Sequence, residues 1–204
     1  AIGPLQAELV ALQNQVAAAP PMVFSEVPAG AGNAPWDFTS GEGIKLFKDA
    51  TKALYLADKF SGKVGDLQHF LTLVENRGES YGWSDIFEIT TATGEVRNLL
   101  TQYGSITKAE VVTHVDVFKD ADAGANGRKR QAQRCLTTFL KDSIKKAPMT
   151  ELQQEKDDYT LLVGGPGGAM KEMGLLMLWE LVRMVSIETR ATVETLTEKL
   201  TDVI

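Results

Sequence analysis

GLLMLWELVRMV, residues 174–185, is the most hydrophobic stretch of the chain, and it decides which kind of fold we expect. Its apolar side chains cover several sides of a helix, which is typical of a helix that is buried by more than one neighbour. We predict that this helix runs from residue 169 to about 201 and has a single apolar face in its second half. Glu180 and Arg183 interrupt the stretch, which therefore falls short of the roughly 18 apolar residues that span a bilayer. We expect no membrane partner.

The composition is that of an ordinary soluble protein. The chain has 204 residues, of which 44% are hydrophobic and 24% charged, enough for one large domain or two small helical lobes. A net charge of −6 argues against a chain dominated by nucleic-acid contacts, although it leaves room for a local basic patch. The single cysteine, Cys135, excludes an internal disulfide and a cysteine-based zinc site. Together with the lack of a secretory signal in the first twenty residues, it predicts a cytoplasmic location.

Helical periodicity runs through most of the chain, so the sequence predicts an all-α fold of roughly six to eight helices. Thr107 followed by Glu110 has the spacing of a capping box at the start of one helix. Residues 128–147 are predicted to form another helix, and a third begins near Thr150. The segment at 86–90, IFEIT, is compatible with a short strand or with a helix end.

A glycine-rich stretch, GGPGG at 164–168, separates the last two predicted helices. It lacks the Lys-Ser or Lys-Thr pair that a phosphate-binding P-loop requires. Because glycine adopts backbone conformations that other residues avoid, we interpret the stretch as a flexible hinge or a tight turn between helices. The proposed hinge residues are Gly164, Gly165, Gly167 and Gly168.

GRKRQAQR, residues 127–134, is the one candidate patch for an anion or for weak RNA binding. Arg130 and Arg134 are spaced i, i+4 and therefore share a helix face. The favoured alternative is a solvated helix start or a site of intersubunit salt bridges, because no aromatic residues interleave for base stacking. The candidate residues are Arg128, Lys129, Arg130 and Arg134.

No catalytic, cofactor or metal site emerges from the sequence, and we expect a protein that is not an enzyme and has no small-molecule substrate. His69 and His114 each lie among apolar neighbours without a second ligand at helical spacing, so both are interpreted as structural. DADAGANG, residues 120–127, fails the ligand spacing of a calcium loop because Gly124 and Gln131 occupy ligand positions. A Cys–His dyad with Cys135 has no local support.

Two apolar stripes are candidate oligomer interfaces. Near the N-terminus, the 4, 3, 4 spacing of a heptad seam is too short for an independent coiled coil. We expect this helix to dock on its own chain or a neighbour, and the alternative is a frayed helix that continues an upstream segment. The last predicted helix has a methionine-rich stripe, for which core packing is the common explanation and an adaptable binding surface the alternative. The interface candidates are Leu5, Leu9, Leu12, Val16, Met173, Met177, Trp179 and Met184.

KFSGKVGDLQHFLTLVENRGESYGW, residues 59–83, carries a resemblance to a known family. A Phe-x-Gly leads into a helix with a Phe70–Leu71 pair, and Gly82–Trp83 follows. Together with NLLTQYGSIT at 98–107 and GLLMLWELVRMVSIETRATVETLTEKL at 174–200, this order resembles Gag-like capsid proteins of long-terminal-repeat retrotransposons of microalgae. A CCHC zinc knuckle, which would carry nucleocapsid function, is absent from the sequence.

The resemblance implies a structural protein that self-assembles into a virus-like shell around a retroelement genome, as an intracellular homo-oligomer. It implies an N-terminal helix and extended arm (1–43), an N-terminal helical lobe (44–147) and a C-terminal helical lobe (148–204), with 120–128 as the alternative position of the lobe boundary. The alternative is a helical adaptor or scaffold that binds a protein partner through the methionine-rich C-terminal helix.

Overall fold

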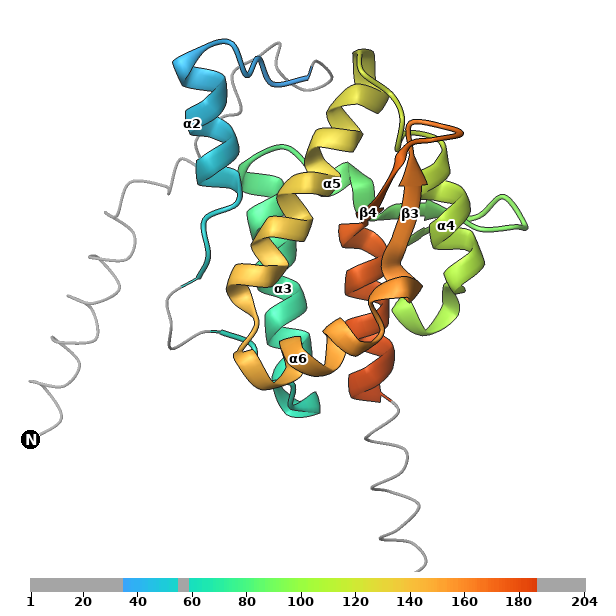
Figure 1. Cartoon of the computed structure of the whole chain (residues 1–204). Coiled ribbons are helices and arrows are strands. Elements are labelled where there is room, and N and C mark those ends of the chain that lie inside the picture. Colours follow the sequence, from blue (N-terminus) through green and yellow to red (C-terminus); the bar gives the residue numbers. More distant parts are fainter. Residues whose placement is uncertain (1–34, 55–58, 187–204) are drawn as a thin grey trace, which may run out of the picture.

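The most hydrophobic stretch forms the central helix of the protein. The computed structural model describes residues 35–54 and 59–186, and within it residues 174–186 are helical. The Leu175 N–H donates to Gln133, which lies in α5 (Gly124–Ser143), and Glu180 pairs with Lys108 at the start of α4 (Lys108–Asp116). Figure 1 shows this helix between α5 and α4. Four consecutive side chains, residues 175–178, have no solvent exposure, so the prediction of burial from several sides is confirmed.

The other elements surround this helix. The remaining α-helices are α2 (Gly41–Ala50), α3 (Val64–Ser80) and α6 (Lys146–Gln154). Short 3₁₀ segments are η2 (Ser84–Phe87), η3 (Tyr103–Ser105) and η4 (Lys156–Tyr159). The strands are β1 (Glu88–Thr90), β2 (Val96–Asn98), β3 (Thr160–Val163) and β4 (Ala169–Glu172).

The prediction of an all-α fold is wrong, because the protein contains two antiparallel β-hairpins. β1 pairs with β2 in the register Glu88↔Asn98 and Thr90↔Val96, so IFEIT contributes a strand preceded by a 3₁₀ turn. Side chains at Ile89 and Thr91 point inward and are buried, which anchors this hairpin against the core. The fold is therefore mixed, with helices predominating.

The second hairpin replaces the predicted hinge. β3 and β4 pair in the register Leu162↔Met170 and Val163↔Ala169, so residues 164–168 form its turn rather than a hinge between helices. Gly164, Gly165 and Gly167 adopt positive φ angles that side-chain-bearing residues rarely reach. The predicted helix start at 169 is wrong for the same reason, since cross-strand hydrogen bonds hold residues 169–172 in a strand.

One predicted helix start is confirmed, whereas the boundaries of the two following helices differ from the prediction. The capping box of Thr107 and Glu110 is present at the start of α4, as predicted. The helix predicted for 128–147 begins earlier, at Gly124, and ends at Ser143, because Ile144 forms a parallel bridge with Phe60. The next helix therefore starts before Thr150, at Lys146.

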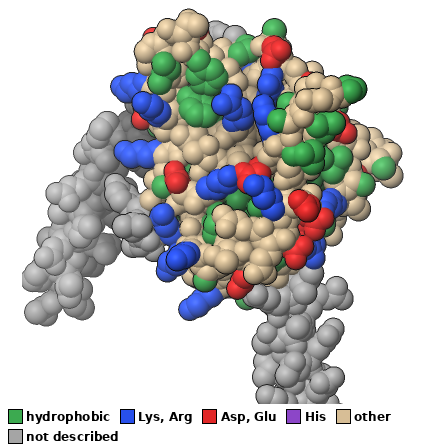
Figure 2. All heavy atoms as spheres, in the orientation of Figure 1, with side chains coloured by type: hydrophobic (Ala, Val, Ile, Leu, Met, Phe, Trp, Pro, Cys, Tyr) green, Lys and Arg blue, Asp and Glu red, His purple; other side chains and the backbone are tan. Residues whose placement is uncertain are grey.

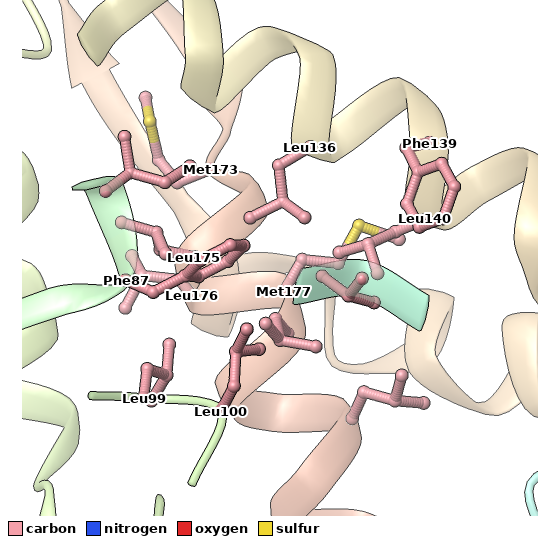
Figure 3. Close-up of a cluster of buried hydrophobic side chains, with 14 of the residues drawn as sticks. Phe87, Leu99, Leu100, Leu136, Phe139, Leu140, Met173, Leu175, Leu176 and Met177 are labelled. Atoms are coloured by element: carbon pink, nitrogen blue, oxygen red, sulfur yellow. The ribbon is translucent and has the colours of Figure 1, made fainter. Parts of the chain in front are cut away.

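One hydrophobic core joins the segments assigned to two lobes. Figure 3 shows Leu136 and Phe139 of α5 beside Leu176 and Met177 of the central helix, with Phe87 in the same cluster. Residues from both sides of the predicted 147/148 boundary belong to this cluster. The predicted 147/148 boundary therefore does not separate two clusters of buried side chains among the described residues.

The segment at 59–83 places an aromatic anchor in that core. The α3 helix is followed by Gly82, whose φ of 65° turns the chain so that Trp83 points inward. The backbone N–H of Trp83 donates to the Gly78 carbonyl at 2.8 Å, and the Trp83 side chain is fully buried. This geometry explains why the segment ends with a glycine-tryptophan pair.

Candidate functional site

The predicted basic patch at the start of α5 is not a patch in the structure, because its members point to different partners. Arg128 is buried, with its guanidinium carbon 3.5 Å from the centroid of the Trp36 ring and its Nη2 donating to the Tyr81 carbonyl at 3.0 Å. Burial lowers the pKa of Arg128 to about 10, so it is still a cation at neutral pH. Arg128 holds Trp36 against α5 and is not available to a ligand.

Two further patch residues have acidic partners. Lys129 lies 3.9 Å from an Asp85 carboxylate oxygen. Arg130 pairs with Asp122 and also donates to a backbone carbonyl at residue 121. The fourth residue, Arg134, is exposed, and its guanidinium lies 5.9 Å from the centroid of the Phe47 ring. Arg134 alone reaches an open cavity.

That cavity, of about 610 Å³, lies between one face of α5 and the β3–β4 hairpin, and we call it the α5–hairpin groove. The α5 residues at the groove are spaced by three and four, so they form a single helix face. Figure 2 shows basic side chains grouped around acidic ones near the middle of this side of the molecule. The groove is lined by Arg134, Thr137, Thr138, Lys141, Lys156, Asp157, Thr160, Met170, Lys171 and Glu172.

The charges of the α5–hairpin groove are unevenly satisfied. Glu172 accepts from Lys141 and lies 3.3 Å from the Lys156 ammonium. Burial raises the pKa of Glu172, but the two lysines outweigh that effect and hold the pKa below its usual value. Within the part of the chain that the structure describes, Arg134 and Lys171 form no ion pair. Of the four groove cations, Lys141 and Lys156 are therefore paired with Glu172, and Arg134 and Lys171 form no ion pair in the described structure.

Toward a ligand, the threonine hydroxyls of the groove offer acceptor oxygens, because their protons are already engaged in hydrogen bonds. Each donates its proton to the backbone carbonyl four residues earlier, at distances between 2.7 and 3.1 Å. A ligand in the groove thus meets ammonium and guanidinium donors, with hydroxyl oxygens that accept hydrogen bonds. The hydroxyls belong to Thr137, Thr138 and Thr160.

The sequence reasoning missed three of the four groove cations. Arg134 and Lys141 are two helical turns apart on α5, a spacing that is readable from the sequence. The hairpin that brings Lys171 and Glu172 opposite them was predicted as a hinge and a helix, so no sequence signal connected the two walls. The wall of the groove opposite α5 is therefore formed by the hairpin and η4, which the sequence analysis did not predict.

The buried carboxylate of Glu180 belongs to a structural ion network. Its oxygens lie 3.0 Å from the Lys108 ammonium and 2.6 Å from Nε of Arg183, and Lys108 also contacts Asp158 at 2.7 Å. The Nε1–H of Trp179 donates to the Ile106 carbonyl at 2.9 Å on the same side of the central helix. These contacts fix the central helix to the start of α4, and Trp179 is half-buried in them rather than free for a partner.

The predicted oligomer interface is only partly on the surface. Met173 and Met177 lie in the core, with 4% and 0% exposure, so these two side chains offer no surface to a partner. Met184 is half-buried against the core. The remaining interface candidates, Leu5, Leu9, Leu12 and Val16, lie outside the described residues.

Large apolar side chains are exposed elsewhere. Leu162 and Met170 face each other across the β3–β4 hairpin and are 42% and 62% exposed. Phe38, just before α2, and Ile44, within α2, are 38% and 40% exposed, and the Phe38 ring packs edge-on against Phe47. Exposed apolar side chains that lie together, unlike scattered ones, are candidate contact surfaces.

The cysteine and histidines do not form a site among the described residues. Burial raises the pKa of the Cys135 thiol, which keeps it protonated and unreactive. No group of three histidine, cysteine, aspartate or glutamate side chains within 35–54 and 59–186 could hold a metal ion. His114 packs edge-on against Phe118, with ring centroids 5.4 Å apart.

We expect His114 to make the protein less stable at acid pH. Burial and the nearby Lys129 charge lower the pKa of His114 from 6.5 to about 4, against an opposing backbone hydrogen bond with Ile86. The unfolded chain therefore binds a proton between these pH values that the folded chain does not, so stability falls as pH drops from 6.5 to 4. Allowing for solvent screening, the loss is on the order of 1–2 kcal/mol.

The measurement is urea unfolding across that pH range. The His114→Gln variant should show a shallower fall in stability than the wild-type protein, because its side chain does not titrate. The exposed His69, replaced by glutamine, is the matched control and should reproduce the wild-type slope. Parallel curves for wild type and His114→Gln would contradict the assignment.

Comparison with protein-family models, curated proteins and solved structures gives no match to this chain. In the described part of the chain, no helix has both the length and the hydrophobicity needed to cross a bilayer. The candidate functional surfaces are therefore defined by geometry: the α5–hairpin groove and the exposed apolar side chains on the hairpin and beside α2.

Proposed function

We propose that this chain is a self-assembling structural protein, the subunit of a Gag-type shell, and not an enzyme. The observation that carries the proposal is the β3–β4 hairpin, which exposes Leu162 and Met170 as a directly opposed apolar pair. The resemblance of residues 59–83, 98–107 and 174–200 to Gag-like proteins supports the same function. In this proposal the shell is an intracellular particle that encloses a retroelement genome.

The hairpin has the properties of a contact element. It is two-stranded, so within the described structure each strand has one edge without a strand partner. Such edges, together with exposed apolar side chains, favour pairing with another chain. Association would remove Leu162 and Met170 from water and add backbone hydrogen bonds, both of which stabilise a contact.

A closed shell needs more than one kind of contact per subunit, and the apolar side chains beside α2 offer a second surface. Phe38 and Ile44 lie next to Phe47, whose ring also packs against Trp36 with centroids 6.0 Å apart. Phe47 therefore makes edge-on ring contacts with both Trp36 and Phe38 at this second surface. The burial of Met173 and Met177 leaves the adaptor hypothesis without two of the side chains on which it was based.

Replacing Leu162 and Met170 together with lysine is expected to weaken assembly, at a small cost to the hairpin itself because the two lysines stand directly opposite each other. Both side chains are exposed, so lysine is accommodated in the monomer, but like charges at an edge oppose strand pairing. The measurement is light scattering after size-exclusion chromatography, with electron microscopy of the same fractions. The variant should need at least about tenfold higher concentration to form particles.

Val64→Lys is the matched control, because Val64 is 50% exposed and is the first residue of α3, outside the hairpin. It should assemble like the wild-type protein. A wild-type protein that stays monomeric over a wide range of salt and concentration would contradict the proposed function. Particles that form equally well with both lysines in place would remove the hairpin from the contact.

A further inference from the structure

We propose that the α5–hairpin groove binds phosphate groups. Arg134 and Lys171 contact the ligand first. Lys141 and Lys156 contact it after they exchange the Glu172 carboxylate for a phosphate oxygen. Three observations carry the inference: the cavity, the two cations in it that form no ion pair in the described structure, and the Glu172 carboxylate that pairs with the other two cations.

With a free polyphosphate as ligand, this inference goes beyond the proposed function. With RNA as ligand it rests on the proposed function, because the proposed shell encloses a retroelement genome. Assembly and ligand binding are measured separately, so either proposal can fail without the other.

The geometry places cations on both walls of the groove. Arg134 and Lys141 stand two turns apart on α5, about 10 Å along the helix axis. Lys171 on β4 and Lys156 on η4 belong to the opposite wall. Cations on two walls of a cavity of about 610 Å³ can contact different oxygens of one multiply charged anion, which a flat patch cannot do.

The unpaired cations are exposed and free to move to a ligand. Arg134 packs its guanidinium near the Phe47 ring, which leaves its N–H edge for a hydrogen-bonded anion. Lys171 is exposed at the groove and forms no ion pair within residues 35–54 and 59–186. Neither side chain forms an ion pair in the described structure, and Asp157 is the acidic side chain that lines the groove besides Glu172.

Glu172 occupies the inner part of the groove as a counter-ion. It holds the ammonium groups of Lys141 and Lys156 together, which would otherwise repel each other. A phosphate oxygen offers the two lysines the same kind of charge-assisted hydrogen bond as the Glu172 carboxylate does. Glu172 is therefore a competitor of the ligand, and its neutral isostere should strengthen binding.

The acceptor oxygens of the groove hydroxyls indicate which phosphate compounds fit best. A ligand that brings hydroxyl donors beside its phosphates can satisfy the oxygens of Thr137, Thr138 and Thr160. The ribose 2′-hydroxyl is such a donor, and deoxyribose lacks it. Phosphate could reach the groove from single-stranded RNA or from a free polyphosphate, and the experiment separates these sources.

The test measures affinity at low salt for three probes: inorganic tripolyphosphate by calorimetry, and labelled oligouridylate and oligothymidylate by fluorescence anisotropy. The Arg134→Gln/Lys171→Gln variant should lose about tenfold in affinity for the probes that bind. For the oligonucleotides, the slope of log affinity against log salt concentration should become shallower by roughly 0.7 for each cation removed. Glu172→Gln should bind more tightly than wild type, which a purely structural role of Glu172 would not produce.

Lys52→Gln/Lys63→Gln is the matched control, with the same change in net charge at exposed positions outside the groove. It should bind like the wild-type protein, and thermal melting of every variant checks that the fold is retained. If tripolyphosphate is the one probe that binds, the groove is assigned to free polyphosphates. If oligouridylate binds more tightly than oligothymidylate, the groove is assigned to an RNA backbone. The proposal is overturned if no probe binds, or if both double variants lose affinity equally.

Discussion

Replacing Trp83 with alanine is expected to lower the free energy of unfolding by about 3–5 kcal/mol, the largest effect of any substitution considered for this protein. The Trp83 side chain is fully buried, and its ring lies 5.8 Å from that of Phe87 and 6.4 Å from that of Phe139. Alanine would remove these contacts and leave a cavity between α5 and η2, which the packed surroundings cannot fully close. The loss is a large part of the 5–15 kcal/mol that stabilises a typical domain.

Urea unfolding followed by circular dichroism measures this loss without relying on tryptophan fluorescence. Trp83→Phe is the matched control, since phenylalanine keeps most of the aromatic contact and removes an indole N–H that has no hydrogen-bond partner among the described atoms. Its cost should be less than half that of alanine. If Trp83→Ala loses less than about 1 kcal/mol, the ring is not an anchor of the core.

The second large effect is expected at Gly174, where the central helix crosses α5. A Cβ atom at this position would lie 2.7 Å from the Thr137 backbone nitrogen and 2.9 Å from the Gln133 carbonyl oxygen. Both neighbours are backbone atoms of a helix and cannot rotate away. Gly174→Ala should therefore push the two helices apart and destabilise the protein by about 1–3 kcal/mol.

The matched control for this crossing is Gly65→Ala in α3, where an added Cβ has nothing within 4 Å. Alanine there should stabilise the protein by about 0.5–1 kcal/mol, because glycine is the poorer helix former. If the same glycine-to-alanine change destabilises the protein at residue 174 and stabilises it at residue 65, the close contact between helices at Gly174 controls its effect, and not the helix propensity of glycine. Thermal unfolding of both variants provides the comparison, and equal stability of the two would contradict the close crossing.

The α5–hairpin groove was predictable from the sequence only along one wall. Arg134 was among the predicted patch residues, and the face it shares with Lys141 follows from helical periodicity. Arg128, in the same predicted patch, is buried against Trp36, because the ring of a distant segment covers it. A run of basic residues on a helix does not reveal which of them meet solvent, since that depends on what packs over each face.

The burial of residues 174–185 on several sides and the capping box of Thr107 and Glu110 were determined by the sequence alone. Both depend on side chains within a few residues of one another, for which spacing is a sufficient description. The pairing of β3 with β4 and the single core across residues 147/148 were decided only by the tertiary structure. A short apolar run such as TLLV fits a helix or a strand equally well, and the choice is made by hydrogen bonds to a partner strand beyond the glycine turn.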